Sequence, residues 1–140
     1  MIDPISATFQ ISSNGLSAQA QRLRVISENL ANAQSTGETA GSDPYRRKTV
    51  TFKSEMDRAL GAELVEIKDI GNDSAPFRVE YDPGHPAADE NGRVKLPNVN
   101  TMIELSDMRE ANRSYEANLK VISQTRSMVL RTIDLLRSSS

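Results

Sequence analysis

Residues 101–137 read TMIELSDMREANRSYEANLKVISQTRSMVLRTIDLLR, a stretch that contains neither glycine nor proline. Apolar residues recur in it every seven positions, the spacing of a helix that packs along one seam. One row consists of Met108, Tyr115, Ile122, Val129 and Leu136, and a second row of Leu105, Asn112, Leu119, Arg126 and Ile133. The stretch predicts one helix of roughly 55 Å at 1.5 Å per residue, with Thr101 and Glu104 forming a capping box at its start.

Further apolar residues lie outside these two rows, at Val121, Met128, Leu130 and Leu135. One partner helix cannot cover all of this surface, which is typical of a helix with several neighbours. Asn112 and Arg126 interrupt the second row. A polar residue there either fixes the register of the packing or faces solvent or the lumen of a tube. The register role is favoured for Asn112, and both roles stay open for Arg126.

A second helical stretch lies at the other end, where Gly15 is the sole helix breaker between residues 5 and 35. Its seven-residue row is Phe9, Leu16, Leu23 and Leu30, and its partner row is Ser12, Gln19, Ile26 and Ala33. Asp3 before Pro4 predicts an N-cap followed by proline at the first helical position. The helix is expected to end near residues 35–37.

Nearly all prolines and glycines lie between residues 36 and 97, which favours strands and turns there. Alternating stretches at 49–53, 64–70 and 77–81 have strand character, and 94–96 suits a short edge strand. We expect 64–70 and 77–81 to pair across a turn at 71–76. The predicted fold is mainly α: two long terminal helices form a coiled-coil-like pair around a small insert with a β-hairpin. Residues 1–35 and 98–140 are expected to form a discontinuous helical assembly domain, and 36–97 the insert.

Composition excludes several classes of function. Aromatic residues make up 4% of the 140-residue chain and tryptophan is absent, so its own core is small. We expect other copies to complete that core and the isolated monomer to have disordered ends. The net charge of −2, without a basic stripe, argues against nucleic-acid binding. The absence of cysteine excludes thiol catalysis and cysteine-based zinc sites. Neither a cleavable secretory signal nor a membrane span is expected.

No residue pattern supports catalysis or a cofactor, because no nucleophile–histidine–acid spacing and no phosphate-binding loop are present. His85, the single histidine, stands between Gly84 and Pro86 without a second imidazole nearby, so turn formation explains it better than metal binding. The acidic residues at 82–91 likewise lack the twelve-residue pattern of a calcium loop. The chain is therefore not expected to be an enzyme or to bind a metal.

Two polar clusters leave alternatives open. Asn29 and Asn32 either form a specific interface joint or are residues of a helix C-terminus, where asparagine is tolerated as a cap; the joint is favoured mainly by the resemblance below. Residues 46–48, two arginines and a lysine, could bind phosphate or lipid headgroups. The start of a surface strand fits this short cluster better, and a contact with acidic residues of an adjacent subunit is also open.

Several motifs resemble the flagellar rod and hook axial protein family. They are NLANAQSTG at 29–37, DPYRR at 43–47, PNVN at 97–100 and ANRSYEAN at 111–118. The segment YDPGHPAAD at 81–89 resembles the proximal-rod members more than the distal-rod or hook members. Leu105, where many relatives have methionine, and the polar tail at 137–140 depart from the family pattern without disturbing the heptad rows.

The resemblance implies a structural subunit of the proximal rod, which is part of a drive shaft and export channel used in motility. Its implied partners are other proximal and distal rod subunits, basal-body ring or adaptor proteins, and the type III export apparatus that secretes it uncleaved into the periplasm. The predicted assembly interface comprises Phe9, Leu16, Leu23, Ile26, Asn29, Leu30, Asn32, Leu105, Met108, Asn112, Tyr115, Leu119, Ile122, Val129, Ile133 and Leu136. The alternative is a cytoplasmic coiled-coil adaptor or secretion chaperone.

Overall fold

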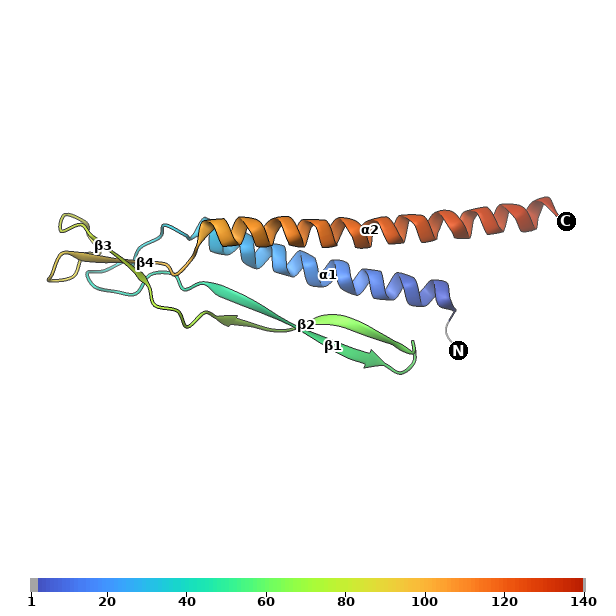
Figure 1. Cartoon of the computed structure of the whole chain (residues 1–140), viewed down its shortest axis with the longest axis horizontal. Coiled ribbons are helices and arrows are strands. Elements are labelled where there is room, and N and C mark those ends of the chain that lie inside the picture. The colour runs from blue at the N-terminus through green and yellow to red at the C-terminus, as the bar shows by residue number, and fades with distance from the viewer. Residues whose placement is uncertain (1–2, 140) are drawn as a thin grey trace.

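The computed structural model describes residues 3–139 and has an elongated shape (Figure 1). In chain order its elements are α1 (Pro4–Ala31), β1 (Lys48–Asp57), β2 (Ala62–Asn72), β3 (Arg78–Tyr81), β4 (Arg93–Leu96) and α2 (Thr101–Ser138). The two helices run antiparallel, with α1 between α2 and the β1–β2 hairpin, while β3 and β4 lie at the end opposite the C-terminus. The predicted fold class, two paired terminal helices around a small β insert, is confirmed.

Helix α1 begins as predicted and ends earlier. The Asp3 carboxylate accepts a hydrogen bond from the Ile5 N–H at 3.4 Å, and Pro4 occupies the first helical position. The C-cap is Asn32, whose side chain donates to the Glu28 carbonyl at 2.8 Å. Because this amide occupies a carbonyl of the last turn, the helix stops at Ala31, several residues before the predicted end.

Helix α2 covers the predicted range, but its predicted capping box is wrong. The N-cap is Asn100, whose side-chain oxygen accepts hydrogen bonds from the N–H groups of Met102 and Ile103 at 3.0 and 3.4 Å. Glu104 does not reach back to Thr101, because its carboxylate is buried and bonded to residues of two other segments. Asn100, directly before the helix, is the residue placed to cap it.

The predicted pairing of 64–70 with 77–81 is also wrong. β2 pairs antiparallel with β1, with Phe52 opposite Ile67, and one irregularity in register lies between Thr51 and Phe52. A tight turn at 57–61 joins the two strands. The Asp57 carboxylate accepts the N–H groups of residues 59 and 60, and Gly61 has a φ of +64° that favours glycine. These turn signals lie in a region without a predicted turn.

The second hairpin pairs β3 with β4, with Arg78 opposite Leu96 and Tyr81 opposite Arg93. The strand predicted at 94–96 is therefore confirmed, and its neighbour is 78–81, the stretch for which a pairing with 64–70 was predicted. Val94 and Leu96 are buried, whereas all four residues of β3 are exposed. β4 thus contributes to the core, and β3 covers it with an open outer surface.

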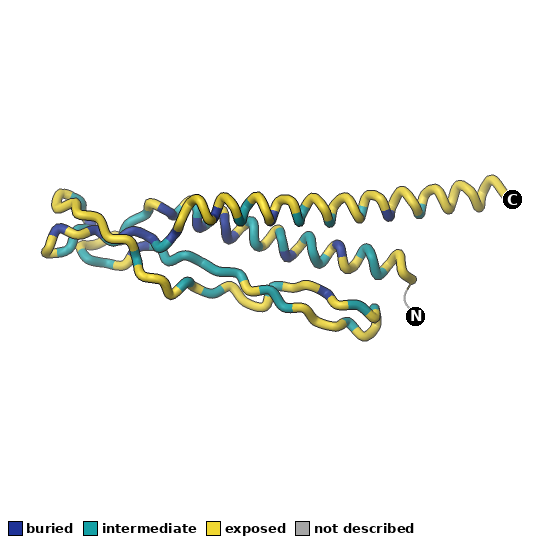
Figure 2. Tube along the Cα trace, viewed as in Figure 1, coloured by how far each residue is buried: buried dark blue, intermediate teal, exposed yellow. Residues whose placement is uncertain are grey.

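The buried residues gather where α1, the start of α2 and the strands meet, and few lie toward the C-terminal end of α2 (Figure 2). The apolar core there includes Val25, Ile26, Val94, Leu96 and Val99. Within residues 3–139, no helix has the length and hydropathy to cross a membrane. The core sits at the junction of helices and strands, and the helix ends extend away from it.

Candidate assembly interface

Helices α1 and α2 contact each other along a seam with a seven-residue repeat. Asn29 donates to Glu104 at 3.2 Å, and Arg22 lies 3.4 Å from Glu110. Gly15 faces Asn118, since a Cβ at residue 15 would lie 2.8 Å from the Asn118 Nδ2 atom. As the residue number rises on α1, from 15 to 22 to 29, the number of the contacting residue on α2 falls, from 118 to 110 to 104. The spacing matches antiparallel coiled-coil packing.

The first predicted row of α2 lies along this seam. Met108, Tyr115, Ile122 and Val129 are each half-buried, whereas Leu136, the last member, is 66% exposed. On α1, Ile26 and Asn29 are buried, and half-buried positions are occupied by Phe9, Leu16, Leu23, Leu30 and Asn32. Most of the predicted interface residues therefore contribute to packing within one chain. Their role between subunits stays a prediction.

The second predicted row is exposed along its whole length: Leu105, Asn112, Leu119, Arg126 and Ile133. The second row that faces α1 lies one residue before the predicted one, at Glu104, Ala111, Asn118 and Thr125. Asn118 is half-buried and the other three are buried. Small and polar residues suit this position because α1 approaches α2 closely there. The Thr125 hydroxyl is satisfied by the Val121 carbonyl at 2.9 Å.

The C-terminal end of α2 has no buried residue. All residues from 130 to 139 are exposed, and they include Leu130, Ile133 and Leu135. Figure 1 shows the reason: α2 continues past the N-terminal end of α1, so α1 does not cover it. We call residues 126–138 the α2 tail.

A polar junction centred on Asn29 joins the two helices to the start of β1. The Asn29 side chain is 1% exposed and makes four hydrogen bonds. Its amide group donates to the Lys48 carbonyl at 2.9 Å and to Glu104. Its oxygen accepts from the Lys48 N–H at 2.9 Å and from the Tyr45 hydroxyl at 2.8 Å. A buried amide with all groups satisfied fixes the position of its neighbours. Asn29 is thus a joint within one chain.

Glu104 and Arg47 supply the charge of this junction. Glu104 is 1% exposed and accepts a hydrogen bond from the Arg47 Nε atom. The same guanidinium lies 3.4 Å from Asp73 and 3.7 Å from Asp107. Burial acts to lower the pKa of Arg47, but the hydrogen bonds and charges of Glu104 and Asp73 outweigh it and raise that pKa overall. The arginine is therefore held as a cation between α2 and the strands.

Further contacts of the junction are made by Asn98, just before α2. Its side-chain oxygen accepts the Arg47 N–H at 2.8 Å, and its amide donates to the carbonyls of Asp73 and Ala75 at 3.2 and 3.0 Å. Arg46 donates to the same two carbonyls and stacks 4.2 Å from the centre of the Phe77 ring. The segment between β2 and β3 is thereby attached to the residues that precede β1 and α2.

The basic cluster at 46–48 is therefore occupied inside the chain. Arg46 and Arg47 bind the junction, and the Lys48 ammonium lies 2.7 Å from the Glu28 carboxylate, which lowers the pKa of Glu28 mainly through that hydrogen bond. The predicted strand start is confirmed, because β1 begins at Lys48. A contact of this cluster with acidic residues of an adjacent subunit stays a prediction. No sequence period signals the junction, because its members come from four separate segments.

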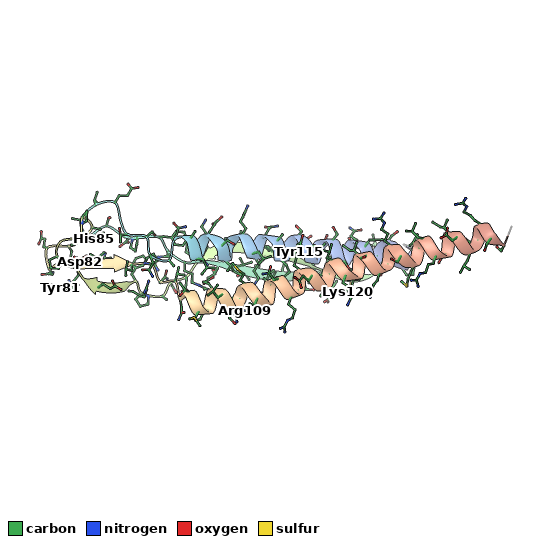
Figure 3. All side chains as sticks on the ribbon, turned by 90° about the horizontal axis from the view of Figure 1, so that it is seen from above. Tyr81, Asp82, His85, Arg109, Tyr115 and Lys120 are labelled. Atoms are coloured by element: carbon green, nitrogen blue, oxygen red, sulfur yellow. The ribbon has the colours of Figure 1, made fainter. Side chains whose placement is uncertain are left out.

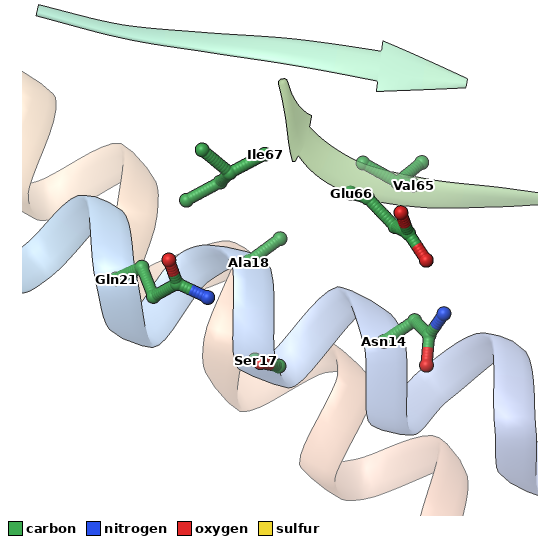
Figure 4. A pocket seen from close by; sticks show the side chains of 7 residues that line it. All are labelled: Asn14, Ser17, Ala18, Gln21, Val65, Glu66 and Ile67. Carbon is green, nitrogen blue, oxygen red and sulfur yellow. The ribbon is translucent and has the colours of Figure 1, made fainter. Parts of the chain in front are cut away.

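The polar residues of the predicted turns at 82–92 make local contacts. The His85 Nδ1 atom accepts the Ala87 N–H at 3.0 Å, and Asp89 accepts the N–H groups of residues 91 and 93, as in the predicted turns. A shallow cleft of about 280 Å³ between α1 and β2 contains one carboxylate, Glu66, which lies 3.5 Å from Lys53 (Figure 4). One ion-paired carboxylate does not make an acid–base pair.

Known proteins match this chain at both ends and over its length. Residues 9–37 match the family described as "Flagella basal body rod protein", and residues 90–135 match "Flagellar basal body rod FlgEFG protein C-terminal". The chain is 62% identical to the flagellar basal-body rod protein FlgC of Agrobacterium fabrum, over 99% of both chains.

More distant relatives have the same name. Identity to FlgC of Escherichia coli O6:H1 is 40%, over 91% of this chain and 94% of that protein. Identity to FlgC of Borreliella burgdorferi is 36%, over 94% and 97%. The two matched families cover the two helices that form the seam. The chain therefore belongs to the FlgC family of flagellar basal-body rod proteins.

Proposed function

We propose that this chain is a structural subunit of the proximal rod of the bacterial flagellum. It polymerises through its terminal helices and so forms part of the drive shaft and of the export channel that motility requires. The observation that carries the proposal is the 62% identity to a flagellar basal-body rod protein over 99% of both chains. The function is non-enzymatic.

The distribution of apolar surface supports polymerisation. Large apolar side chains stay exposed on α2 at Leu105, Leu119, Leu130 and Ile133 after α1 has packed on the opposite side. An exposed apolar row of this kind, although interrupted by Asn112 and Arg126, is typical of a protein that buries apolar surface against partners. We assign residues 1–35 and 98–140 to the assembly domain and 36–97 to the insert, which the junction attaches to the helices.

The proposed neighbours are proximal and distal rod subunits, with basal-body ring or adaptor proteins at the periphery. The proposed location is the rod in the periplasm, reached through the flagellar type III export apparatus without cleavage. The names of the relatives support assembly in a rod. The exposed polar residues Asn112 and Arg126 fit a surface that faces solvent or the channel, and they leave the register role as the alternative.

The adaptor or chaperone alternative makes a different prediction about location. In a strain that lacks the gene, the restored chain should be recovered in purified basal bodies and should restore motility. A chain that stays in the cytoplasm while other subunits complete a rod without it would refute the proposal. Ile133→Asp serves as the assembly-defective variant and Ser127→Asp, an exposed polar position on α2, as its control.

A further inference from the structure

The β1–β2 hairpin is held firmly at its base. There the polar junction binds it, because the Asn29 side chain bonds both backbone polar groups of Lys48 and Arg47 binds Glu104. Outside the hairpin, α1 is the only described helix or strand that contacts it. The two helices lie side by side in both Figure 1 and Figure 3, and Figure 1 places the hairpin on the side of α1 away from α2. Beyond its base the hairpin therefore depends on one helix.

Few directed contacts join the outer hairpin to that helix. Among the described residues, the hydrogen bonds and ion pairs from α1 to other segments end on Tyr45, on Lys48 and on acidic residues of α2, and none ends on residues 49–72. The Arg22 guanidinium lies 6.0 Å from the centre of the Phe52 ring, at the outer limit of a cation–π interaction. The outer hairpin is thus attached to α1 mainly by apolar packing.

This apolar packing is incomplete. Leu64 is the only buried residue in β1 and β2. The cleft of about 280 Å³ between α1 and β2 lies where Ala18 points toward Ile67 (Figure 4). A second cleft, of about 460 Å³, is lined in part by Val25 and Phe52. Atoms that line a void lose dispersion contacts, and a segment with few buried apolar contacts opens at a low free energy.

A bending point lies near the base, at the irregularity in register. Thr51 is opposite Asp69 and Phe52 is opposite Ile67, so β2 has one extra residue at this step. An extra residue of this kind interrupts the ladder and bends the strand. We call the part of the hairpin beyond it, residues 52–67, the strap.

The strap has internal contacts that do not involve α1. The Lys53 ammonium lies 2.6 Å from Glu55 and 3.5 Å from Glu66, and the Ser54 hydroxyl donates to Glu63 at 2.9 Å. Within the strap the two strands pair without a further irregularity. These contacts persist when the strap leaves α1, so the strap moves as one body.

We infer that the strap opens away from α1 about the irregularity in register, while the polar junction and the helix seam stay closed. Opening uncovers Ala18 and Val25, which are 3% and 2% exposed in the closed form and face the two clefts from α1. The strap thus gives α1 a second contact surface that is covered in one state and accessible in the other. Because it concerns a single chain, the inference does not depend on the proposed function.

Thiol labelling measures this opening without background, because the chain has no cysteine of its own. Purified full-length Ala18→Cys is treated with a fluorescein maleimide, a bulky reagent. The control is Ala111→Cys, at a position on α2 that is 0% exposed and faces α1. Labelling at position 18 should be at least about tenfold faster, since strap opening requires less free energy than separation of the helices. Equal rates would overturn the inference.

Removing the buried side chain of the strap provides the second measurement. Leu64→Ala should accelerate labelling of Ala18→Cys about tenfold, because it deletes apolar contact between the strap and α1. The same change should leave labelling of Ala111→Cys unchanged. An equal acceleration at both positions would show that the strap does not open independently. If neither rate changes, the reagent reaches position 18 with the strap closed, and the inference fails.

Filling the cleft should have the opposite effect. Asn14 lines it beside Val65 (Figure 4), so Asn14→Leu should add apolar contact and slow labelling of Ala18→Cys about threefold. The matched control is Ser13→Leu, at the exposed neighbouring position of α1, which should leave the rate unchanged. Equal slowing by both substitutions, or no slowing by Asn14→Leu, would contradict closure of the strap over this cleft.

Discussion

Neutralising Glu104 tests whether the polar junction holds the helices to the strands. Glu104→Gln keeps the shape of the side chain and removes the charge opposite Arg47, whose side chain is 21% exposed. Leaving one member of a buried ion pair without its partner typically costs about 3–5 kcal/mol. Asp73 and Asp107, at 3.4 and 3.7 Å from the same guanidinium, compensate part of the remaining charge. We therefore expect a loss of about 2–3 kcal/mol in the free energy of unfolding, at or just below the lower end of that range.

The matched control is Glu110→Gln on the same helix. Glu110 faces Arg22 at 3.4 Å, but its side chain is 68% exposed, so the ion pair is worth less than about 1 kcal/mol. At a fixed protein concentration, thermal unfolding followed by circular dichroism should show a decrease in Tm of about 10 °C for Glu104→Gln in a 140-residue chain. The control should change by no more than about 3 °C.

The comparison also has a clear negative outcome. If the two substitutions lower Tm equally, then the buried position of Glu104 contributes nothing beyond a surface ion pair, and the junction does not couple the helices to the strands. A double substitution with Arg47→Met checks the assignment, because the loss caused by Glu104→Gln should shrink when the unpaired guanidinium is removed as well.

Three further predictions concern the seam, the interface and acid stability. Gly15→Ala should lower the free energy of unfolding by roughly 1 kcal/mol in chemical denaturation, because the new Cβ meets the Asn118 side chain. In the Asn118→Ala background the same change should be stabilising, because alanine has a higher helix propensity than glycine. Destabilisation in both backgrounds would contradict the close approach of the helices at Gly15. Ile122→Asp should prevent incorporation into basal bodies, since an unpaired charge in the seam costs several kcal/mol. His85→Ala, in a turn, should leave motility unchanged. If Ile122→Asp leaves motility intact and His85→Ala abolishes it, the assignment of the seam as the assembly element is refuted. Backbone hydrogen bonds, chiefly from Arg93, hold the pKa of Asp89 below its usual 3.8, so this carboxylate contributes stability above that pH and loses it as the pH falls through the lowered value. Asp89→Asn should therefore flatten the decline in Tm below pH 4, and an unchanged decline would count against it.

Local sequence patterns predicted the elements that depend on local interactions. Three local patterns were correct: the Asp3-Pro4 start of α1, the absence of glycine and proline from 101–137, and the row from Met108 to Val129. They placed the start of α1, the extent of α2 and the seam-facing side of α2. Strand character at 49–53, 64–70, 77–81 and 94–96 matched four strands. Backbone propensity, capping and periodicity act within a few residues, so one sequence suffices to recognise them. Motif likeness then indicated the family.

Tertiary structure alone decided how these elements are combined. The row of α2 that faces α1 begins at Glu104 and not, as predicted, at Leu105. This depends on the close approach of α1 and on Arg47, which binds Glu104 from a distant segment of the chain. The same holds for strand pairing and for the four hydrogen bonds of Asn29, whose partners are 16 to 75 residues away in the chain. A buried charge is stable only where its partners converge in three dimensions, and that convergence has no sequence period.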